Sequence, residues 1–484
     1  MPEENDNQTE NIEASENQET STEETAPASE RRHIFSRRNV GISFGAIALL
    51  LVLLVGSAIV VYRYGYLDDY VKRQFVAKMD EIGVNFSADT FRLTVMPLQL
   101  HLENATFNDK LTGEKLFFIR DAKLGLTVQD LYAWQLSRDI SIDTTDVDGA
   151  EVWVKFDENG NSNFDNLKFV EDEAGSRVNF TYESLRFSLK NSVIHFGDVT
   201  RKISADAKNV ALTLEPENVL VPDEQKRYKF DFTSTDSTFV YDESVVDPID
   251  IRANGIVDKL GAEIANLKLT SPIGESTLNG TLTDWAELKY NLNVASTVDL
   301  TQTSNIFPLG TPLRGVGNFS GTVTGQGERY KVVGEINSDA LAASNIRLKA
   351  LQLNATVEGD GSMYNANGKA IAELLTFEDF QIDFPQMVGN IRGTGTDFRW
   401  VGELQAAAAR TPSGTIAGLF ISDAVAEYKD NELDATLGNL RAAKFSSEDV
   451  ELQTLLAQNV KISNAGDTTT VSAPNLRAGV VKTE

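Results

Sequence analysis

Four polar residues in the first half of the chain alternate in the manner of a calcium-binding loop: Asp157, Asn159, Asn161 and Asn163. A loop of this kind needs a glycine at its sixth position, whereas Gly160 stands at the fourth. We therefore interpret the segment as a hairpin turn and predict no metal site. The same interpretation applies to a second acidic cluster, formed by Asp143, Asp146 and Asp148.

Residues that could carry catalysis are few. The chain has no cysteine and three histidines, which are His33, His101 and His195. Thiolate chemistry and cysteine-ligated metals are thereby excluded, and little room is left for a serine–histidine–aspartate triad. His195 could pair with Asp198, but no serine or cysteine nucleophile is evident beside them.

One glycine-rich stretch, from Gly315 to Gly321, is spaced almost like a phosphate-binding loop. Its third glycine comes one position late, and no helix is expected after it. We interpret it as a turn between strands, and we predict no cofactor and no enzymatic activity. Paired carboxylates are nevertheless abundant, so a polysaccharide-processing enzyme on a β-solenoid stays open as an alternative.

The charge distribution excludes one class of partner. The chain carries 44 Lys and Arg against 71 Asp and Glu, a net charge of -27. This balance argues against nucleic acid, whose binding depends on cationic side chains. Residues 1–30 contain ten acidic residues and neither Lys nor Arg. They hold too few apolar side chains to fold, so residues 1–39 are expected to be a disordered acidic tail with a basic segment at its end.

Residues 40–62 form an uncharged apolar run of 23 residues. A helix of that length measures about 35 Å, enough to cross a bilayer. We predict an uncleaved signal anchor, because the run is longer than the apolar region of a signal peptide. Basic residues balance across it, with Arg37 and Arg38 immediately before it and Arg63 immediately after it. The two adjacent arginines favour a cytoplasmic N-terminus.

Beyond the span, one amphipathic helix is expected over residues 66–82, ended by Gly83. After it the chain alternates apolar and polar residues, the pattern of half-exposed antiparallel strands. The turn signals are Asp148-Gly149, Asn159-Gly160, Asn254-Gly255, Asn279-Gly280 and Asp360-Gly361. Only four further short stretches are candidate helices: 129–136, 370–375, 403–409 and 450–457.

The apolar phase of these strands supplies the candidate binding residues. They are Leu98, Leu100, Leu102, Leu124, Leu126, Val128, Val152, Val154, Phe156, Leu185, Phe187, Leu189, Leu288, Tyr290 and Leu292. With so few helices to cover it, a sheet of about 20 to 25 strands must close on itself or curl around something else. We predict a mostly β protein with an elongated, curled antiparallel sheet that forms a half-pipe groove.

Several stretches match a known family in order and spacing. They read IGVNF (82–86), VMPLQLHLENATF (95–107), IRDAKLGLTVQDLYAW (119–134) and ISIDTTDVDGAEVWVKFDENGNSNFDNLKF (140–169). Glycine-punctuated strands follow at 313–336 and 346–361. The chain resembles the AsmA-like envelope proteins, over about residues 40–170 and more loosely over 250–400. By this resemblance, residues 63–170 are expected to form an AsmA-like N-terminal region and residues 171–484 a repetitive β-groove region.

The resemblance implies a location and a function. Such proteins are anchored in the bacterial inner membrane, with most of the chain in the periplasm, and are implicated in moving phospholipids towards the outer membrane. We expect a single-pass, non-enzymatic protein that holds phospholipid acyl chains along its groove, with possible envelope protein partners. The alternative is a periplasmic scaffold or assembly factor whose sheet buries its own apolar face.

Overall fold

The computed structural model describes most of the chain beyond residue 66. The described residues are 67–95, 97–128, 139–168, 179–181, 186–218, 220–222, 225–285, 287–307, 311–429, 432–465 and 468–483. The expected tail (1–39) and span (40–62) lie outside them. No helix within the described ranges is long and apolar enough to cross a membrane.

The described chain is almost entirely strand. One helix, α2 (Leu67–Glu81), precedes the strands, and a second, α3 (Leu300–Ile306), interrupts them. The strands are β1 (Val84–Ser87), β2 (Thr90–Val95), β3 (Leu98–Asp109), β4 (Lys115–Val128), β5 (Asp139–Phe156), β6 (Asn179–Thr181), β7 (Arg186–Asp198), β8 (Ile203–Pro216), β9 (Tyr228–Tyr241), β10 (Ser244–Val257), β11 (Ala262–Ser271), β12 (Gly274–Asp284), β13 (Lys289–Asp299), β14 (Leu313–Gln326), β15 (Arg329–Ala343), β16 (Ile346–Asp360), β17 (Met363–Ile371), β18 (Leu374–Phe377), β19 (Phe380–Asp383), β20 (Gln386–Thr394), β21 (Asp397–Thr411), β22 (Gly414–Lys429), β23 (Glu432–Ser446), β24 (Val450–Ala465), β25 (Thr468–Ser472) and β26 (Asn475–Thr483).

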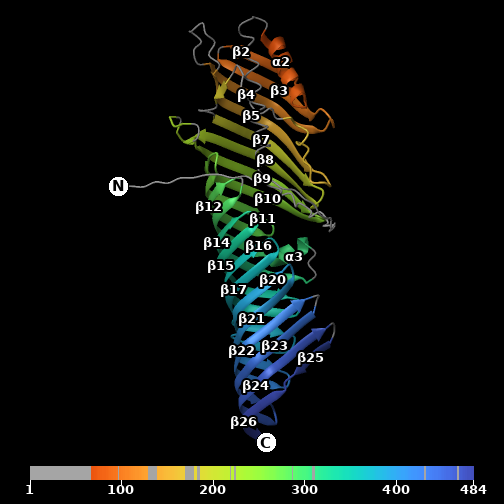
Figure 1. Cartoon of the computed structure of the whole chain (residues 1–484), viewed down its shortest axis with the longest axis vertical. Coiled ribbons are helices and arrows are strands. Elements are labelled where there is room, and N and C mark those ends of the chain that lie inside the picture. The colour runs from red at the N-terminus through yellow and green to blue at the C-terminus, as the bar shows by residue number, and fades with distance from the viewer. Residues whose placement is uncertain are drawn as a thin grey trace, which may run out of the picture.

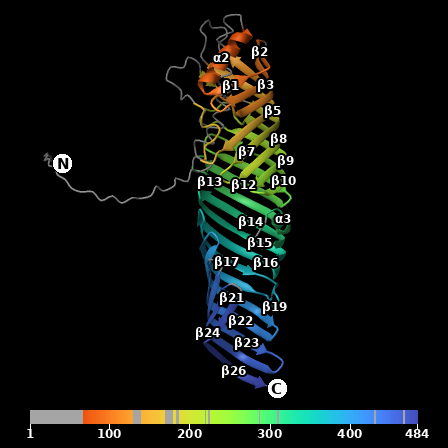
Figure 2. The same cartoon turned by 90° about the vertical axis from the view of Figure 1, so that its right-hand side faces the viewer.

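All these strands belong to one 26-stranded sheet. From β7 to β17 each strand pairs with the next along the chain, and β20 to β24 continue in the same way. The short hairpin of β18 and β19 fills the space beside β17 and β20, between β16 and β21. The strands therefore follow one another along the length of the molecule largely in the order of the sequence, with α2 at one end and β26 at the other (Figures 1 and 2).

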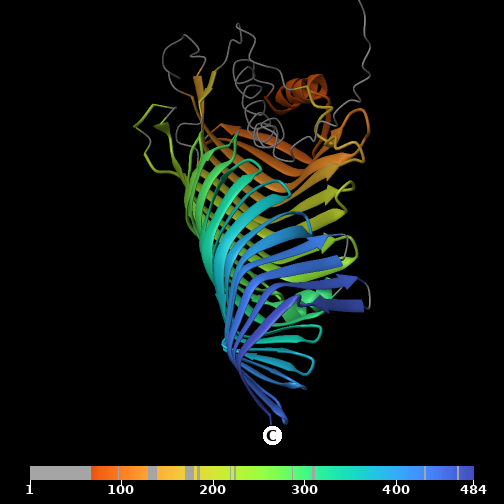
Figure 3. The same ribbon diagram turned by 60° about the horizontal axis from the view of Figure 1, so that its bottom comes forward.

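The sheet curls about its long axis, as Figure 3 shows. The prediction of a mostly β, curled sheet is thereby confirmed. One detail was wrong, because the sheet is not purely antiparallel: β6 and β7 both run parallel to β5. The chain between β5 and β7 is long enough for the crossover that a parallel pair requires, unlike the tight turns that join most other neighbouring strands.

α2 covers the N-terminal end of the sheet. Phe75 and Met79 of α2 are fully buried, and the ring of Phe75 lies 4.6 Å from that of Phe86, edge to face. Gly83 follows the helix with φ +88°, a conformation that ends helices and suits glycine. The helix expected over 66–82 is therefore present, and it encloses a filled core with β1 to β5.

The other predicted helices are wrong where they can be checked. Residues 370–375 lie at the end of β17 and the start of β18, residues 403–409 lie in β21, and residues 450–457 lie in β24. Residues 129–136 fall outside the described ranges. The alanine-rich run in β21 has a helical propensity, but pairing with β20 and β22 on both sides decides its conformation.

Three of the five turns predicted from dipeptides were also wrong, as were the turns predicted at the Asp143, Asp146 and Asp148 cluster and at residues 315–321, which lie inside β5 and β14. Asn159-Gly160 and Asp360-Gly361 do lie at turns, but Asp148-Gly149, Asn254-Gly255 and Asn279-Gly280 lie inside β5, β10 and β12. Gly149 has φ +72°, and the register of β10 shifts between Asn254 and Gly255. These dipeptides mark bulges and bends within long strands.

Most long strands contain one such irregularity. Residues with left-handed φ near +50° interrupt seven of the described strands, namely Asn104, Asn191, Asn209, Asp236, Ala350, Asp423, and both Thr454 and Asn459 in β24. Asparagine and aspartate tolerate this conformation better than most residues. On either side of Asn104, Leu102 and Ala105 are both fully buried. Each irregularity thus moves the alternation of inward and outward side chains by one residue. The apolar side chains on both sides of it then point to the same face of the sheet.

Candidate functional site

A row of apolar residues runs along one face of the sheet from end to end. Strand register joins each member to the next: Phe91, Leu102, Ala122, Val147, Leu189, Leu212, Phe232, Ala253, Leu267, Leu278, Val294, Gly321, Gly334, Ala355, Gly368, Gly389, Gly402, Ala424, Leu437 and Val460. We call it the central row. It contains no polar side chain, and at about 4.8 Å per strand it is on the order of 90 Å long.

The central row is buried at its N-terminal end, half-buried along most of its length, and buried again at Ala424 and Val460, where Ala424 belongs to a second small core cluster with Trp400. Leu102 and Ala122 lie in the core beneath α2, with 0% and 2% exposure. From Leu212 to Leu437 most members are of intermediate exposure. α2 packs on β1 and β2, whereas α3 lies against β14. The described helices therefore leave most of the apolar face without a covering layer.

The opposite face is polar and more exposed. In β13 the exposed Asn291, Asn293 and Thr297 alternate with half-buried Leu292 and Val294. Ion pairs join neighbouring strands on this polar face. Lys331 Nζ lies 2.8 Å from Glu358, and Arg399 Nε lies 2.8 Å from Glu427. Hence the two faces differ in chemistry along the repetitive part of the sheet.

Two open hollows in the described part of the chain lie mostly on the polar face, and each also reaches two members of the central row, Gly334 and Ala355 in one and Val294 and Gly321 in the other. One, of about 730 Å³, is lined mainly by polar-face residues such as Ser320, Glu335 and Asn354. Another, of about 650 Å³, is lined by Thr277, Asn279 and their neighbours. Both are shallow gaps between short polar side chains, and neither carries a cluster of groups suited to catalysis.

The predicted binding residues divide into three sets. Leu98, Leu100, Leu102, Leu124, Val152, Val154, Phe187 and Leu189 belong to the core under α2 or pack against it, and Phe156 is also buried. Tyr290 and Leu292 are half-buried on the uncovered part of the apolar face, and Leu288 precedes them at φ +49°. Leu185 and the side chains of Leu126 and Val128 lie outside the described residues.

Apart from Tyr290, sequence reasoning missed a second apolar row, at the edge of the same face. Register joins Leu282, Tyr290, Gly325, Tyr330, Gly359, Tyr364, Gly393, Phe398 and Tyr428. We call it the rim row. Its tyrosine rings lie over glycines of the next strand: Tyr290 over Gly325, Tyr330 over Gly359 and Tyr364 over Gly393.

A sequence signal for the rim row exists. The pattern Gly-x-Gly-x-x-aromatic occurs three times at equal intervals, beginning at Gly325, Gly359 and Gly393. In each, the second glycine has φ near +60° in the hairpin turn, and the aromatic residue pairs with the first glycine. The recurrence of the pattern marks one hairpin per repeat.

The segment that resembles a calcium loop forms a turn. Asp157 Oδ1 accepts hydrogen bonds from the backbone N–H groups of Asn159 and Asn161, each at 2.8 Å. The bond from Asn161 contributes most to holding the pKa of Asp157 below its ordinary value. The carboxylate therefore already serves as the acceptor that stabilises this turn.

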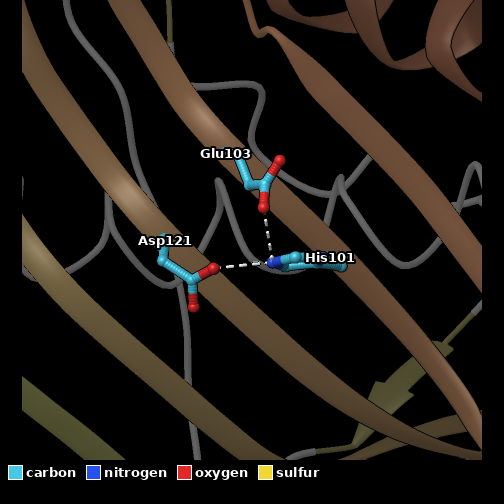
Figure 4. Close-up of side chains that lie close together, drawn as sticks. All are labelled: His101, Glu103 and Asp121. Atoms are coloured by element: carbon cyan, nitrogen blue, oxygen red, sulfur yellow. Dashed lines mark hydrogen bonds and ion pairs between the residues drawn. The ribbon is translucent and has the colours of Figure 1, made fainter.

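One cluster brings together side chains that could ligate a metal: His101, Glu103 and Asp121 (Figure 4). His101 Nε2 lies 2.6 Å from Asp121 Oδ2 and 3.7 Å from Glu103 Oε1. Both carboxylates approach the same ring nitrogen, and Thr90 also donates to Glu103. The cluster lies on the polar face, where Asp121 of β4 meets His101 across the strand pair and Glu103 follows His101 two residues along β3.

His195 does not pair with Asp198. Its Nδ1 lies 2.7 Å from Asp206 Oδ1 across β7 and β8, and its ring stacks on Trp153 at 5.2 Å. Asp198 instead binds the guanidinium of Arg201 at 2.6 Å. The candidate pair was therefore wrong, because the two side chains have different partners.

Comparison with known proteins returns no relative. No family model, no curated protein and no solved structure matches the chain.

Proposed function

We propose that this protein is a non-enzymatic carrier that holds phospholipid acyl chains along the apolar face of its sheet. The observation that supports this most directly is the central row, which stays apolar across strand after strand with no described layer covering most of it. The proposed groove is the concave side of the curl, since the apolar side chains are less exposed than the polar ones opposite.

The energetics of lipid movement favour such a surface. Keeping one CH₂ group out of water is worth about 0.8 kcal/mol, so a sixteen-carbon chain needs on the order of 12 kcal/mol of shelter outside a bilayer. A continuous apolar row offers similar shelter at each strand, and no step along it requires chemistry. The histidine and carboxylate pairs of the described residues lie on the strands and have no role in this proposal.

The location belongs to the same proposal. Residues 40–62 would anchor the chain in a bacterial inner membrane, residues 1–39 would be cytoplasmic, and the sheet would extend through the periplasm towards the outer membrane. The resemblance to AsmA-like proteins supports this arrangement. Envelope proteins are then the partners to be expected, and nucleic acid is not.

A scaffold is the second candidate, and one observation favours it locally. Between α2 and β5 the apolar face is a filled core, in which Phe75, Met79, Leu100, Leu102 and Phe107 are fully buried. A sheet filled in this way throughout would bind no lipid. The half-buried central row from β8 to β21 argues for the carrier in the longer part of the molecule.

Mass spectrometry of the detergent-purified full chain provides the test. The carrier predicts phospholipid that remains bound after the detergent is exchanged, at a ratio reproducible between preparations. A matched single-span protein of unrelated fold, purified in the same way, controls for lipid retained by the anchor. Equal lipid in both samples would contradict the carrier and favour the scaffold.

A further inference from the structure

The two long edges of the apolar face differ in chemistry. One edge carries the rim row, with Tyr290, Tyr330 and Tyr364 on alternate strands and Phe398 and Tyr428 stacked at 5.6 Å beyond them. At the other ends of neighbouring strands, register joins the aliphatic residues Leu341, Leu348, Leu375 and Ile382. All four are half-buried.

The rim tyrosines are held in a defined orientation. The hydroxyl end of each ring lies over a glycine of the adjacent strand, where any Cβ would overlap the ring or its hydroxyl oxygen. The glycines therefore make room for the rings, an arrangement known to stabilise sheets that contain glycine. Tyr290, Tyr330 and Tyr364 are half-buried, and within the described part of the chain their hydroxyls make no hydrogen bond.

A ring that is apolar along its body and polar at its tip suits a boundary between oil and water. Tyrosine is enriched at membrane interfaces for this reason. A phospholipid has the same boundary, where its acyl chains meet the esters and phosphate of the headgroup. Its esters and phosphate accept hydrogen bonds, which a tyrosine hydroxyl can donate.

We propose that the rim row orients bound phospholipid. The headgroup and ester region lies at the edge formed by Tyr290, Tyr330 and Tyr364, and the acyl chains extend across the central row towards the aliphatic edge at Leu348 and Leu375. This inference rests on the proposed function and adds a direction to it. Lipids then bind with one orientation along the sheet.

The absence of cysteine makes the orientation measurable. Thr396 and Ser413 are exposed turn residues at the two ends of β21, and the chain contains no native thiol. β21 has 15 residues, so these turns are about 50 Å apart. Thr396→Cys reports on the rim-row edge and Ser413→Cys on the opposite edge. Each variant of the full chain is labelled with bimane.

The probes are two phosphatidylcholines, one with a nitroxide on its choline and one with a nitroxide near the end of an acyl chain. The headgroup probe is expected to quench bimane at position 396 several-fold more than at position 413, and the chain probe is expected to lower or reverse that ratio. Equal or reversed quenching by the headgroup probe would overturn the orientation. No quenching by either probe at either position would contradict the proposed function itself.

The tyrosine hydroxyls are tested by the combined substitution Tyr290→Phe, Tyr330→Phe and Tyr364→Phe. The rings remain over their glycines, so the sheet is expected to keep its melting temperature. The headgroup probe should then lose its preference for position 396, while total quenching by the chain probe is unchanged. Tyr241→Phe is the matched control, because Tyr241 lies at the end of β9 that is far from the edge with the rim row. This substitution should leave the preference of the headgroup probe for position 396 intact. A preference that survives the triple substitution would contradict the role of the hydroxyls.

Discussion

The ring of Tyr330 lies over Gly359 on the adjacent strand, so that a side chain at position 359 would occupy the space of the ring. The two residues are in register between β15 and β16. Gly359 pairs in turn with Tyr364, whose ring lies over Gly393. Consecutive hairpins are therefore linked through their rim residues as well as through backbone hydrogen bonds.

Gly359→Ala is expected to destabilise the sheet. The added methyl group overlaps the Tyr330 ring, and relieving such an overlap typically costs about 1–3 kcal/mol. The midpoint of chemical unfolding should fall accordingly. Gly317→Ala is the control, because a Cβ at position 317 of β14 meets nothing within 4 Å. An equal loss in both variants would show that the ring contact is not the cause.

Acid sensitivity is expected near the C-terminal edge. Hydrogen bonds from Lys444 and Gln453, with the charges of Lys444 and Lys482, lower the pKa of Glu451 from 4.5 to about 2. A carboxylate whose pKa is lower in the folded state stabilises the fold above its unfolded pKa, and this contribution is lost as the pH falls from 4.5 towards 2. The effect should weaken in high salt, since the group is partly exposed.

Glu451→Gln tests this directly. The variant should be less stable than the native chain at pH 7, and the difference should shrink between pH 4.5 and pH 2, as followed by urea unfolding. Glu448→Gln changes an exposed neighbour in the turn before β24 and serves as the control. A difference between Glu451→Gln and the native chain that stays constant over this range would contradict the assignment.

The turn at Asp157 is expected to be independent of calcium. Its carboxylate accepts backbone hydrogen bonds from Asn159 and Asn161, which stabilise the turn without a metal ion. Asp157→Ala should lower the melting temperature to the same extent with calcium and with a chelator. Tight stoichiometric calcium in a calorimetric titration, lost in Asp157→Ala, would refute the turn assignment.

How far the sequence predicts this fold depends on the scale. Alternation predicts strands throughout, and in β13 it places Tyr290 and Leu292 on the correct apolar face. It fails to predict where strands end, because Asn254-Gly255 and Asn279-Gly280 have the composition of tight turns but lie within β10 and β12. Whether such a dipeptide reverses the chain or bends a strand depends on the neighbouring strands, which local composition does not contain.

For the candidate site too, the sequence predicts which residues are apolar but not which of them are covered by other elements. Leu100 and Leu102 are apolar in the expected phase, but α2 buries them completely, so they are core residues and not open lining. Only the packing of a helix distinguishes them from Leu292. The rim row could have been found from the recurrence of Gly-x-Gly-x-x-aromatic, whereas the placement of a ring over a glycine of another hairpin depends on register.

The membrane topology is a separate prediction. If residues 40–62 anchor the chain with a cytoplasmic N-terminus, a reporter enzyme that is active only after export should be active when fused after Thr90 or after Glu484. A reporter that is active only in the cytoplasm should be inactive at both positions. Cytoplasmic activity at either position would contradict the proposed orientation, because Arg37 and Arg38 would then not hold the N-terminus inside.

The central claim concerns the apolar face, and two adjacent valines allow a matched test of it. Val332 pairs with Val323 and Val357 next to the central row and is half-buried, whereas Val333 pairs with Thr322 and Thr356 on the polar face and is 42% exposed. A carboxylate on the apolar face must either keep water in the acyl path or be desolvated at a cost of several kcal/mol.

The most direct measurement is the amount of phospholipid that co-purifies with Val332→Glu and with Val333→Glu, each as the full chain and each accompanied by a melting curve. The carrier predicts that Val332→Glu loses most of its bound lipid while remaining folded, and that Val333→Glu retains the native amount. Unchanged lipid in a folded Val332→Glu would contradict the assignment of this face to lipid. Unfolding of Val332→Glu alone would instead indicate the filled core of a scaffold.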